Sequence, residues 1–239
     1  MARRLRRRIK PQRFAIGVLV WVAVSTLFGM FLGASCQVAA LRHETPDVTA
    51  FQREAMERRG RVRKKWVDLD RVDPKLVRAV LVAEDSRFFQ HDGFDRAEMK
   101  AALRDAATKL ERLRGASTLS QQLAKNLFLS SERTLTRKAW EAGYTLLLEW
   151  LLSKRRILEL YLNEAQFGPE IYGVEAGARY HFGRSPRSLT DLQAAQLAAV
   201  LPAPTRWGPE SRSRRYRSKV ERILSQMKKS GHLDPFLRR

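Results

Sequence analysis

Cysteine is almost absent from this chain of 239 residues. Cys36 is the only one, so an intramolecular disulfide, a redox-active pair of thiols and a zinc site built from several cysteines are excluded. Acidic residues are also few: 25 Asp and Glu stand against 46 Lys and Arg, which leaves a formal net charge of +21. That excess indicates an acidic partner or an acidic surface, and the positions of the charges along the chain help to distinguish the two.

A β-strand pattern of useful length is lacking too, as is any internal repeat, so neither a β-sheet nor a repeat protein is predicted. Apolar residues recur instead at helical spacing. The sequence therefore predicts a mainly α-helical domain. We expect helices over 74–84, 96–113, 118–127, 134–152, 154–164, 172–182, 190–201 and 213–230, where Ser117 or Thr118 begins the third and Ser131 or Thr134 the fourth.

An uncharged, apolar run fills residues 14–41. A helix of about 20 apolar residues spans a bilayer. A cleaved signal peptide is the alternative, but its apolar core is shorter, about 7–15 residues. The arginine-rich start favours a cytoplasmic N-terminus and export of the rest. We expect a cytoplasmic basic tail over 1–13, a transmembrane anchor over 14–41, a stalk or linker over 42–65 and one globular domain over 66–239.

The positive charge does not indicate nucleic acid, because the aromatic-laced motifs of common nucleic-acid modules are missing. Anionic lipid headgroups or a phosphorylated lipid substrate fit better. The basic stretch from Arg206 onward leaves two interpretations open. It contacts lipid headgroups or an anionic wall polymer, or it is only a solvated helix face.

Two adjacent carboxylates, Glu84 and Asp85, stand at the end of the first helix of the domain, followed by aromatic residues and a histidine. Carboxylates at the edge of a cleft are typical general bases. Glu84 and Asp85 are therefore candidate catalytic residues, and Phe88 and His91 are expected to line the cleft. The alternative is a structural acidic pair held by neighbouring arginines.

Polar side chains gather again in a short helix after Ser117. Gln122 and Lys125 are three residues apart, so they share one helical face. An amide and an ammonium on one face can hold an oxygen-rich ligand. This face suits sugar hydroxyls and phosphate.

The next helix carries Arg133, Arg137 and Glu141 at a spacing of four, with Lys138 beside them. Residues four apart lie on one stripe of a helix. Because the forked donors of arginine match phosphate oxygens, the stripe indicates a diphosphate site. A run of surface salt bridges, each contributing little, is the alternative.

Five stretches stand in order along the chain: EDSRFFQHDG (84–93), GASTLSQQLAKN (115–126), RKAWE (137–141), KRRILELYLN (154–163) and GVEAGARYHFG (173–183). Together they resemble the glycosyltransferase family 51 domain, the peptidoglycan glycosyltransferase, and in particular its monofunctional membrane-anchored members. The resemblance covers about residues 66–204. Ala116, Gly177 and His181 depart from the family's usual residues, and none of them is a candidate for proton transfer.

The resemblance implies a lysozyme-like helical glycosyltransferase domain. It also implies transfer of a growing glycan, held as a polyprenyl diphosphate, onto the 4-hydroxyl of lipid II in one inverting displacement. Glu84 would be the general base, Asp85 would support it, and Glu141 would position a basic partner or a metal.

The same resemblance implies the binding residues. Charge on the leaving diphosphate would be balanced by Lys125, Arg133, Arg137 and Lys138. The donor site would be lined by Ser117, Thr118, Gln122 and Asn126.

No cofactor is implied with certainty, and a divalent cation, Mg or Mn, at the diphosphate stays open. The implied partners are lipid II, the growing polyprenyl-linked glycan, membrane lipids and other cell wall synthesis or division proteins, without nucleic acid. The implied place is the cell inner (cytoplasmic) membrane, crossed once, with the catalytic domain on the periplasmic side.

Two other functions stay open. A lytic transglycosylase or muramidase on the same kind of fold would cleave the glycan with a carboxylic acid, but it needs no phosphate site, so the basic residues around Arg137 favour synthesis. An inert membrane scaffold that binds precursors would need neither Glu84 nor Glu141.

Overall fold

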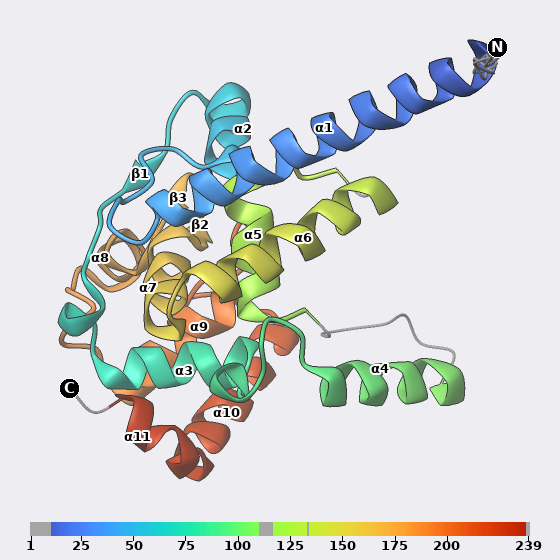
Figure 1. Cartoon of the computed structure of the whole chain (residues 1–239). Helices are drawn as coiled ribbons and strands as arrows, with labels where there is room; N and C mark the ends of the chain where they lie inside the picture. The colour runs from blue at the N-terminus through green and yellow to red at the C-terminus, as the bar shows by residue number, and fades with distance from the viewer. Residues whose placement is uncertain (1–10, 110–116, 133, 238–239) are drawn as a thin grey trace, which may run out of the picture.

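The structure is a computed structural model, and it describes residues 11–109, 117–132 and 134–237. Helices make up most of it, so the prediction of a mainly α-helical fold is confirmed. Figure 1 shows a helical body from which one long helix, α1, extends. Residues 15–40 in α1 are long and apolar enough to cross a membrane, as the sequence predicts.

The elements follow one another along the chain. They are α1 (Pro11–Ala40), α2 (Ala50–Arg59), β1 (Arg63–Lys64), α3 (Pro74–Glu84), α4 (Arg96–Lys109), α5 (Leu119–Phe128), α6 (Leu135–Leu151), α7 (Lys154–Glu164), β2 (Gln166–Gly168), β3 (Ile171–Tyr172), α8 (Val174–Phe182), α9 (Asp191–Val200), α10 (Arg214–Lys229) and α11 (Asp234–Leu237), with short 3-10 turns at Leu69–Arg71, Phe88–Gln90 and Gly231–Leu233.

Each predicted helix has a counterpart among these elements, and residues 110–113 of the second prediction lie outside the described residues. The starts are fixed by side-chain caps. Thr118 accepts a hydrogen bond from the backbone of Gln121 at the start of α5, and Thr134 accepts one from Arg137 at the start of α6. A hydroxyl at this position satisfies an N–H that the first helical turn leaves unpaired.

The last turns of α1 pack on the body. Val38 and Leu41 are buried, and α1 lies beside α6, as Figure 1 shows. Arg42 follows directly, and its Nε donates to the carbonyl oxygen of Leu151 at 2.7 Å. A cationic donor there satisfies a carbonyl at the C-terminal end of α6. The anchor helix is therefore joined to the body by packing and by a hydrogen bond.

The prediction of a stalk over residues 42–65 is wrong, because this segment packs into the body. It contains α2, which lies against α5, and β1. Gln52 in α2 and Lys64 in β1 each donate to the carboxylate of Glu164 at 2.6 Å. These contacts are polar, so an apolar pattern does not reveal them in the sequence.

The expectation of no strands is also corrected. Three short strands form one sheet in the order β1-β3-β2, with β1 parallel and β2 antiparallel to β3. Strands of two or three residues are too short to show alternation. Gly173 follows β3 at φ +80°, and a Cβ there would lie 2.8 Å from the backbone oxygen of Asn163. This close approach requires glycine.

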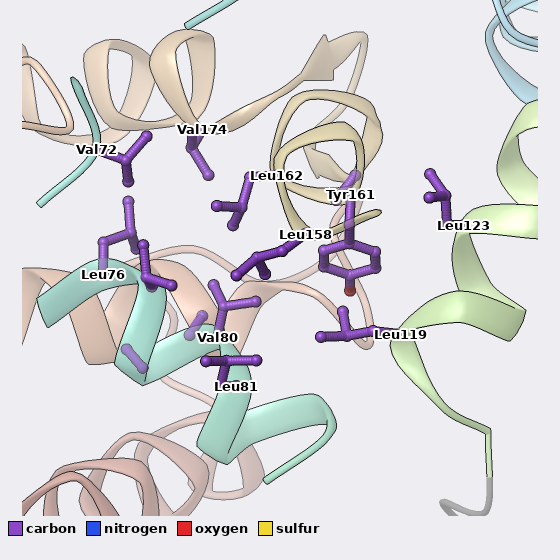
Figure 2. Packing of buried hydrophobic residues seen from close by; sticks show 14 of the residues in the cluster. Val72, Leu76, Val80, Leu81, Leu119, Leu123, Leu158, Tyr161, Leu162 and Val174 are labelled. Carbon is purple, nitrogen blue, oxygen red and sulfur yellow. The ribbon is translucent and has the colours of Figure 1, made fainter. Parts of the chain in front are cut away.

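One hydrophobic core holds the body together. α9 packs on both α3 and α10, and α5 packs on both α6 and α7. Figure 2 shows side chains from α3, α5 and α7 in a single cluster, among them Val80, Leu119, Leu158 and Tyr161. Burying an apolar side chain of this size contributes about 1.5–3 kcal/mol. The core therefore fixes the C-terminal end of α3 relative to α5 and α10.

Candidate active site

Glu84 is the last residue of α3, where the buried face of that helix ends. Its side chain is 12% exposed, and its two carboxylate oxygens have different partners. The ammonium of Lys219 in α10 donates to Oε1 at 2.9 Å, and the amide of Gln122 in α5 donates to Oε2 at 3.1 Å. Three helices thus meet at one carboxylate. A carboxylate only accepts hydrogen bonds, so it is suited to receive a proton from a bound hydroxyl.

Gln122 is itself held in place. The hydroxyl of Tyr161 in α7 donates to Oε1 of Gln122 at 3.0 Å. Burial raises the pKa of Tyr161 well above its ordinary value, and the charges of Glu84 and Asp85 raise it further. The phenol therefore stays a donor, which turns the NH2 group of Gln122 toward Glu84.

Asp85 caps the end of α3 and is buried. Its Oδ2 accepts the backbone N–H of Leu119 at 2.9 Å, and Nε2 of His91 lies 3.1 Å from its Oδ1. These contacts tie the chain after α3 to the start of α5. The side chain of His91 is only 7% exposed. His91 does not line the cavity beside Glu84, but it lines a different cavity together with Gln90 and Phe94.

Phe88 does not line the cleft either. It is fully buried in the hydrophobic core, where Nζ of Lys154 lies 4.4 Å from the ring centroid. The 3-10 turn that follows Asp85 directs the ring inward. Burial of an aromatic ring removes a large apolar surface from water, which explains why this ring packs on the core.

A second cluster lies on α6 around Glu141, which is 3% exposed. Arg137 donates to Oε2 of Glu141 at 2.7 Å, and Lys138 makes an ion pair with Oε1. Nε of Arg137 is buried and has no hydrogen-bond partner within the described residues. A buried donor without a partner indicates room for an acceptor from a ligand.

Lys125 links the two clusters. It follows Gln122 by three residues in α5, so both lie on one face. Burial lowers the pKa of Lys125 below its ordinary value. The carboxylates of Glu141 and Glu84 act in the opposite direction, while Arg137 and Lys138 lower the pKa further. Charged groups of both clusters therefore influence the pKa of Lys125.

The remaining predicted binding residues have different settings. Thr118 is buried and donates to the backbone oxygen of Gly93 at 2.6 Å, so it holds the entry to α5. Ser117 is exposed, and Asn126 is half-buried beside Lys125. Arg133 lies outside the described residues.

A cavity of about 280 Å³ opens beside Glu84. Asp85, Ser117 and Thr118 line it among the predicted residues. Arg222 and Gln226 from α10 line it as well. The candidate residues thus form a carboxylate next to a cavity, and a cationic group on α5 and α6 beside it.

The side chains around Glu141 are not suited to bind a divalent cation. Mg and Mn take oxygen ligands, but here one carboxylate is surrounded by cations that already neutralise it. Within the described ranges, no group of three or more His, Cys, Asp or Glu is placed to hold a metal ion. The cluster is suited to an anion.

Comparison with known proteins agrees with this chemistry. The family model described as Transglycosylase matches residues 52–228. The chain belongs to the transglycosylase family. It is 52% identical over 168 residues to the biosynthetic peptidoglycan transglycosylase of Alcanivorax borkumensis, which covers 70% of this chain and 68% of that protein.

Other relatives match over longer or similar ranges. The biosynthetic peptidoglycan transglycosylase of Shewanella oneidensis is 40% identical over 223 residues, 90% of this chain and 94% of that protein. The protein of the same name from Rhodospirillum centenum is 48% identical over 171 residues, 70% of this chain and 74% of that protein. The resemblance to peptidoglycan glycosyltransferases is therefore confirmed. The matched range also includes residues 52–65, which agrees with their packing in the body.

Sequence reasoning missed two residues at this transglycosylase site. Lys219 was expected only as part of the basic stretch from Arg206 onward, and its partner Glu84 is 135 residues away in the chain. Tyr161 lies in the fourth motif but was given no role. In both cases the contact depends on how distant helices meet, and no local pattern reports it.

Proposed function

We propose that this transglycosylase polymerises lipid II into β-1,4-linked glycan strands for the cell wall and releases polyprenyl diphosphate. The carrying observation is Glu84, a nearly buried carboxylate at a cavity, next to a cationic cluster suited to diphosphate. The names of the relatives, biosynthetic peptidoglycan transglycosylases, support the same substrate class.

Glu84 acts as the general base. The acceptor's 4-hydroxyl donates its hydrogen bond to Glu84, which takes the proton as the oxygen attacks the anomeric carbon of the donor. The carbon–oxygen bond to the diphosphate breaks in the same step, so configuration inverts. A positioned base of this kind contributes about 10²–10⁴-fold to the rate. Asp85 and Gln122 keep the residues around Glu84 in position, and neither of them takes part in the proton transfer.

Lys125, Arg137 and Lys138 stabilise the negative charge that develops on the leaving diphosphate. Glu141 keeps Arg137 and Lys138 on one side of α6, so its role is to position these cations. Because the side chains supply the positive charge, the proposed reaction requires no Mg or Mn ion.

The anchor supports a location at the membrane. A membrane-spanning α1 would hold the body next to the bilayer, and the arginine-rich start supports a cytoplasmic N-terminus. The body then lies on the periplasmic side of the inner membrane, where the lipid-linked donor and acceptor diffuse in the same leaflet. Other cell wall synthesis or division proteins are the partners expected there.

The test is polymerisation of labelled lipid II by the full chain in detergent, with products separated by size. Wild type should give polymeric glycan, and Glu84→Gln should lower the initial rate by about 10²-fold or more because the proton acceptor is gone. Glu98→Gln is the matched control, since Glu98 is an exposed acid that lines the same cavity.

Polymer from Glu84→Gln at the wild-type rate would remove Glu84 from its role. Cleavage of finished peptidoglycan without polymerisation would instead support a lytic enzyme. Thermal unfolding of each variant checks that it is folded.

A further inference from the structure

A second hollow adjoins the cavity at Glu84. It has a volume of about 580 Å³ and is lined by Trp207, Arg214, Arg215, Ser218, Lys219 and Arg222. We refer to it as the α10 groove. Arg222 lines both the α10 groove and the cavity beside Glu84. Lys219 lines the groove and donates to Glu84. The groove and the catalytic cavity are therefore neighbours that share Arg222.

Three basic residues of the groove follow one stripe of α10, which continues to Gln226 in the cavity beside Glu84. Arg215, Lys219, Arg222 and Gln226 are spaced by four, three and four residues, which places them on one helical face. At about 1.5 Å per residue, Arg215 lies roughly 6 Å along the axis from Lys219. The stripe therefore extends by about that distance beyond Lys219, the partner of the catalytic carboxylate.

Lys219 pairs with Glu84, but the arginines of the groove have no carboxylate partner among the described residues. Arg214, Arg215 and Arg222 are exposed, and none has a carboxylate within ion-pair distance in the described part of the chain. Some other arginines of the body do have such a partner, as Arg78 has in Asp234 and Arg179 in Glu175. Several uncompensated arginines around a hollow make an anion site, and their forked donors match carboxylate oxygens.

Trp207 supplies an apolar wall. Its ring lies 6.0 Å from that of Tyr216, which is buried, so the indole is backed by the core of α10. An aromatic ring beside arginines suits a ligand that combines apolar and anionic groups, such as a peptide. A free inorganic anion would gain nothing from that wall.

We propose that the α10 groove binds the carboxylate-bearing peptide of the acceptor substrate. This inference rests on the proposed function, because it takes the acceptor's reacting hydroxyl to lie at Glu84. In lipid II the peptide hangs from the sugar next to the reacting one. A hydroxyl at Glu84 therefore brings that peptide to the mouth of the groove, where Arg215 and Arg222 pair with its carboxylates.

The other anion of the acceptor, its lipid-linked diphosphate, fits the groove less well. The diphosphate must stay at the membrane, because its lipid remains in the bilayer. Figure 1 shows α10 on the opposite side of the body from α1. The same position disfavours membrane headgroups as the occupant.

The test combines a protein change with a substrate change. Initial rates are measured with the full chain in detergent on native lipid II and on lipid II whose peptide carboxylates are amidated. Arg215→Ala should raise KM for native lipid II roughly three- to tenfold, with kcat little changed. This range lies between the contribution of an exposed ion pair and that of a hydrogen bond to a charged group. It should leave KM for the amidated lipid unchanged. Arg217→Ala is the matched control, because Arg217 is exposed on α10 but does not line the groove.

A second measurement does not depend on turnover. Calorimetry with the lipid-free disaccharide-peptide should show binding to wild type and weaker binding to Arg215→Ala. If the ligand binds wild type more tightly than Arg215→Ala but wild type forms no polymer, the groove still binds the peptide, and it is the proposed function, with the role of the groove in it, that fails.

Three results would overturn the assignment. The first is an equal rise in KM for both lipids, which would mean that the carboxylates are not involved. The second is no effect of Arg215→Ala on either KM or on the calorimetric binding. The third is weaker binding of Arg215→Ala to vesicles of anionic lipid with KM unchanged, which would assign the groove to the membrane surface.

Discussion

The sharpest test of the division of roles at the site is Asp85→Ala. Asp85 lies next to the proposed base, yet its contacts are with the protein. Its carboxylate accepts from the backbone of Leu119 at 2.9 Å and lies 3.1 Å from Nε2 of His91. Both partners are buried or nearly so. Alanine removes the acceptor and leaves both groups without one.

The expected cost follows from those two groups. Leaving a buried hydrogen-bonding group unsatisfied costs about 1–3 kcal/mol. Two such groups give about 2–6 kcal/mol, a large part of the roughly 5–15 kcal/mol by which folded proteins are usually stable. At about 2–4 °C per kcal/mol for a domain of this size, the midpoint of thermal unfolding should fall by at least about 4 °C.

The assay is thermal unfolding in detergent, followed by circular dichroism, with polymerisation measured well below the midpoint. Asp92→Ala is the control, because Asp92 is an exposed acid in the same motif and its loss should change stability by less than about 0.5 kcal/mol. An unchanged midpoint together with a rate as low as that of Glu84→Gln would refute the reasoning, since Asp85 would then act in the chemistry.

Two further predictions concern other residues. Gly173→Ala should destabilise the fold by about 2 kcal/mol or more, because φ is +80° and the new Cβ would lie 2.8 Å from a backbone oxygen. Gly60 also has φ +80° but has open space around it, so Gly60→Ala should destabilise the fold less in the same thermal unfolding measurement. The kcat/KM for lipid II should fall as pH rises through the lowered pKa of Lys125, below its ordinary 10.5, because the neutral amine no longer attracts diphosphate. Lys125→Arg should move that alkaline limb to higher pH, and an unmoved limb would assign it to another group.

The helices were predictable because their signals are local. Pro74 after a capping aspartate, apolar residues at helical spacing, and a threonine followed three residues later by glutamine all act within one or two turns. These signals placed Glu84 at a helix end and Gln122 on the face of Lys125. Part of the site could therefore be predicted from the residues themselves.

The errors share a different physical cause. The segment before residue 66 is held by hydrogen bonds to Glu164, and strand β1 pairs with the distant β3, so neither leaves an apolar pattern. Phe88 was expected in the cleft because it follows the acidic pair, but the turn after Asp85 directs its ring into the core. Such outcomes depend on tertiary packing, which outweighs local sequence.

The joint between α1 and α6 affects how a bilayer would act on this protein. α1 has 30 residues, and about 20 suffice for the hydrocarbon of a membrane, so its last turns serve as part of the domain. A helix tilts when its apolar length exceeds the local hydrocarbon thickness. Because Arg42 and the buried end of α1 join the helix to the body, that tilt would rotate the catalytic cavity relative to the membrane plane. The thickness of the bilayer would thus change the position of Glu84 relative to a lipid-linked substrate.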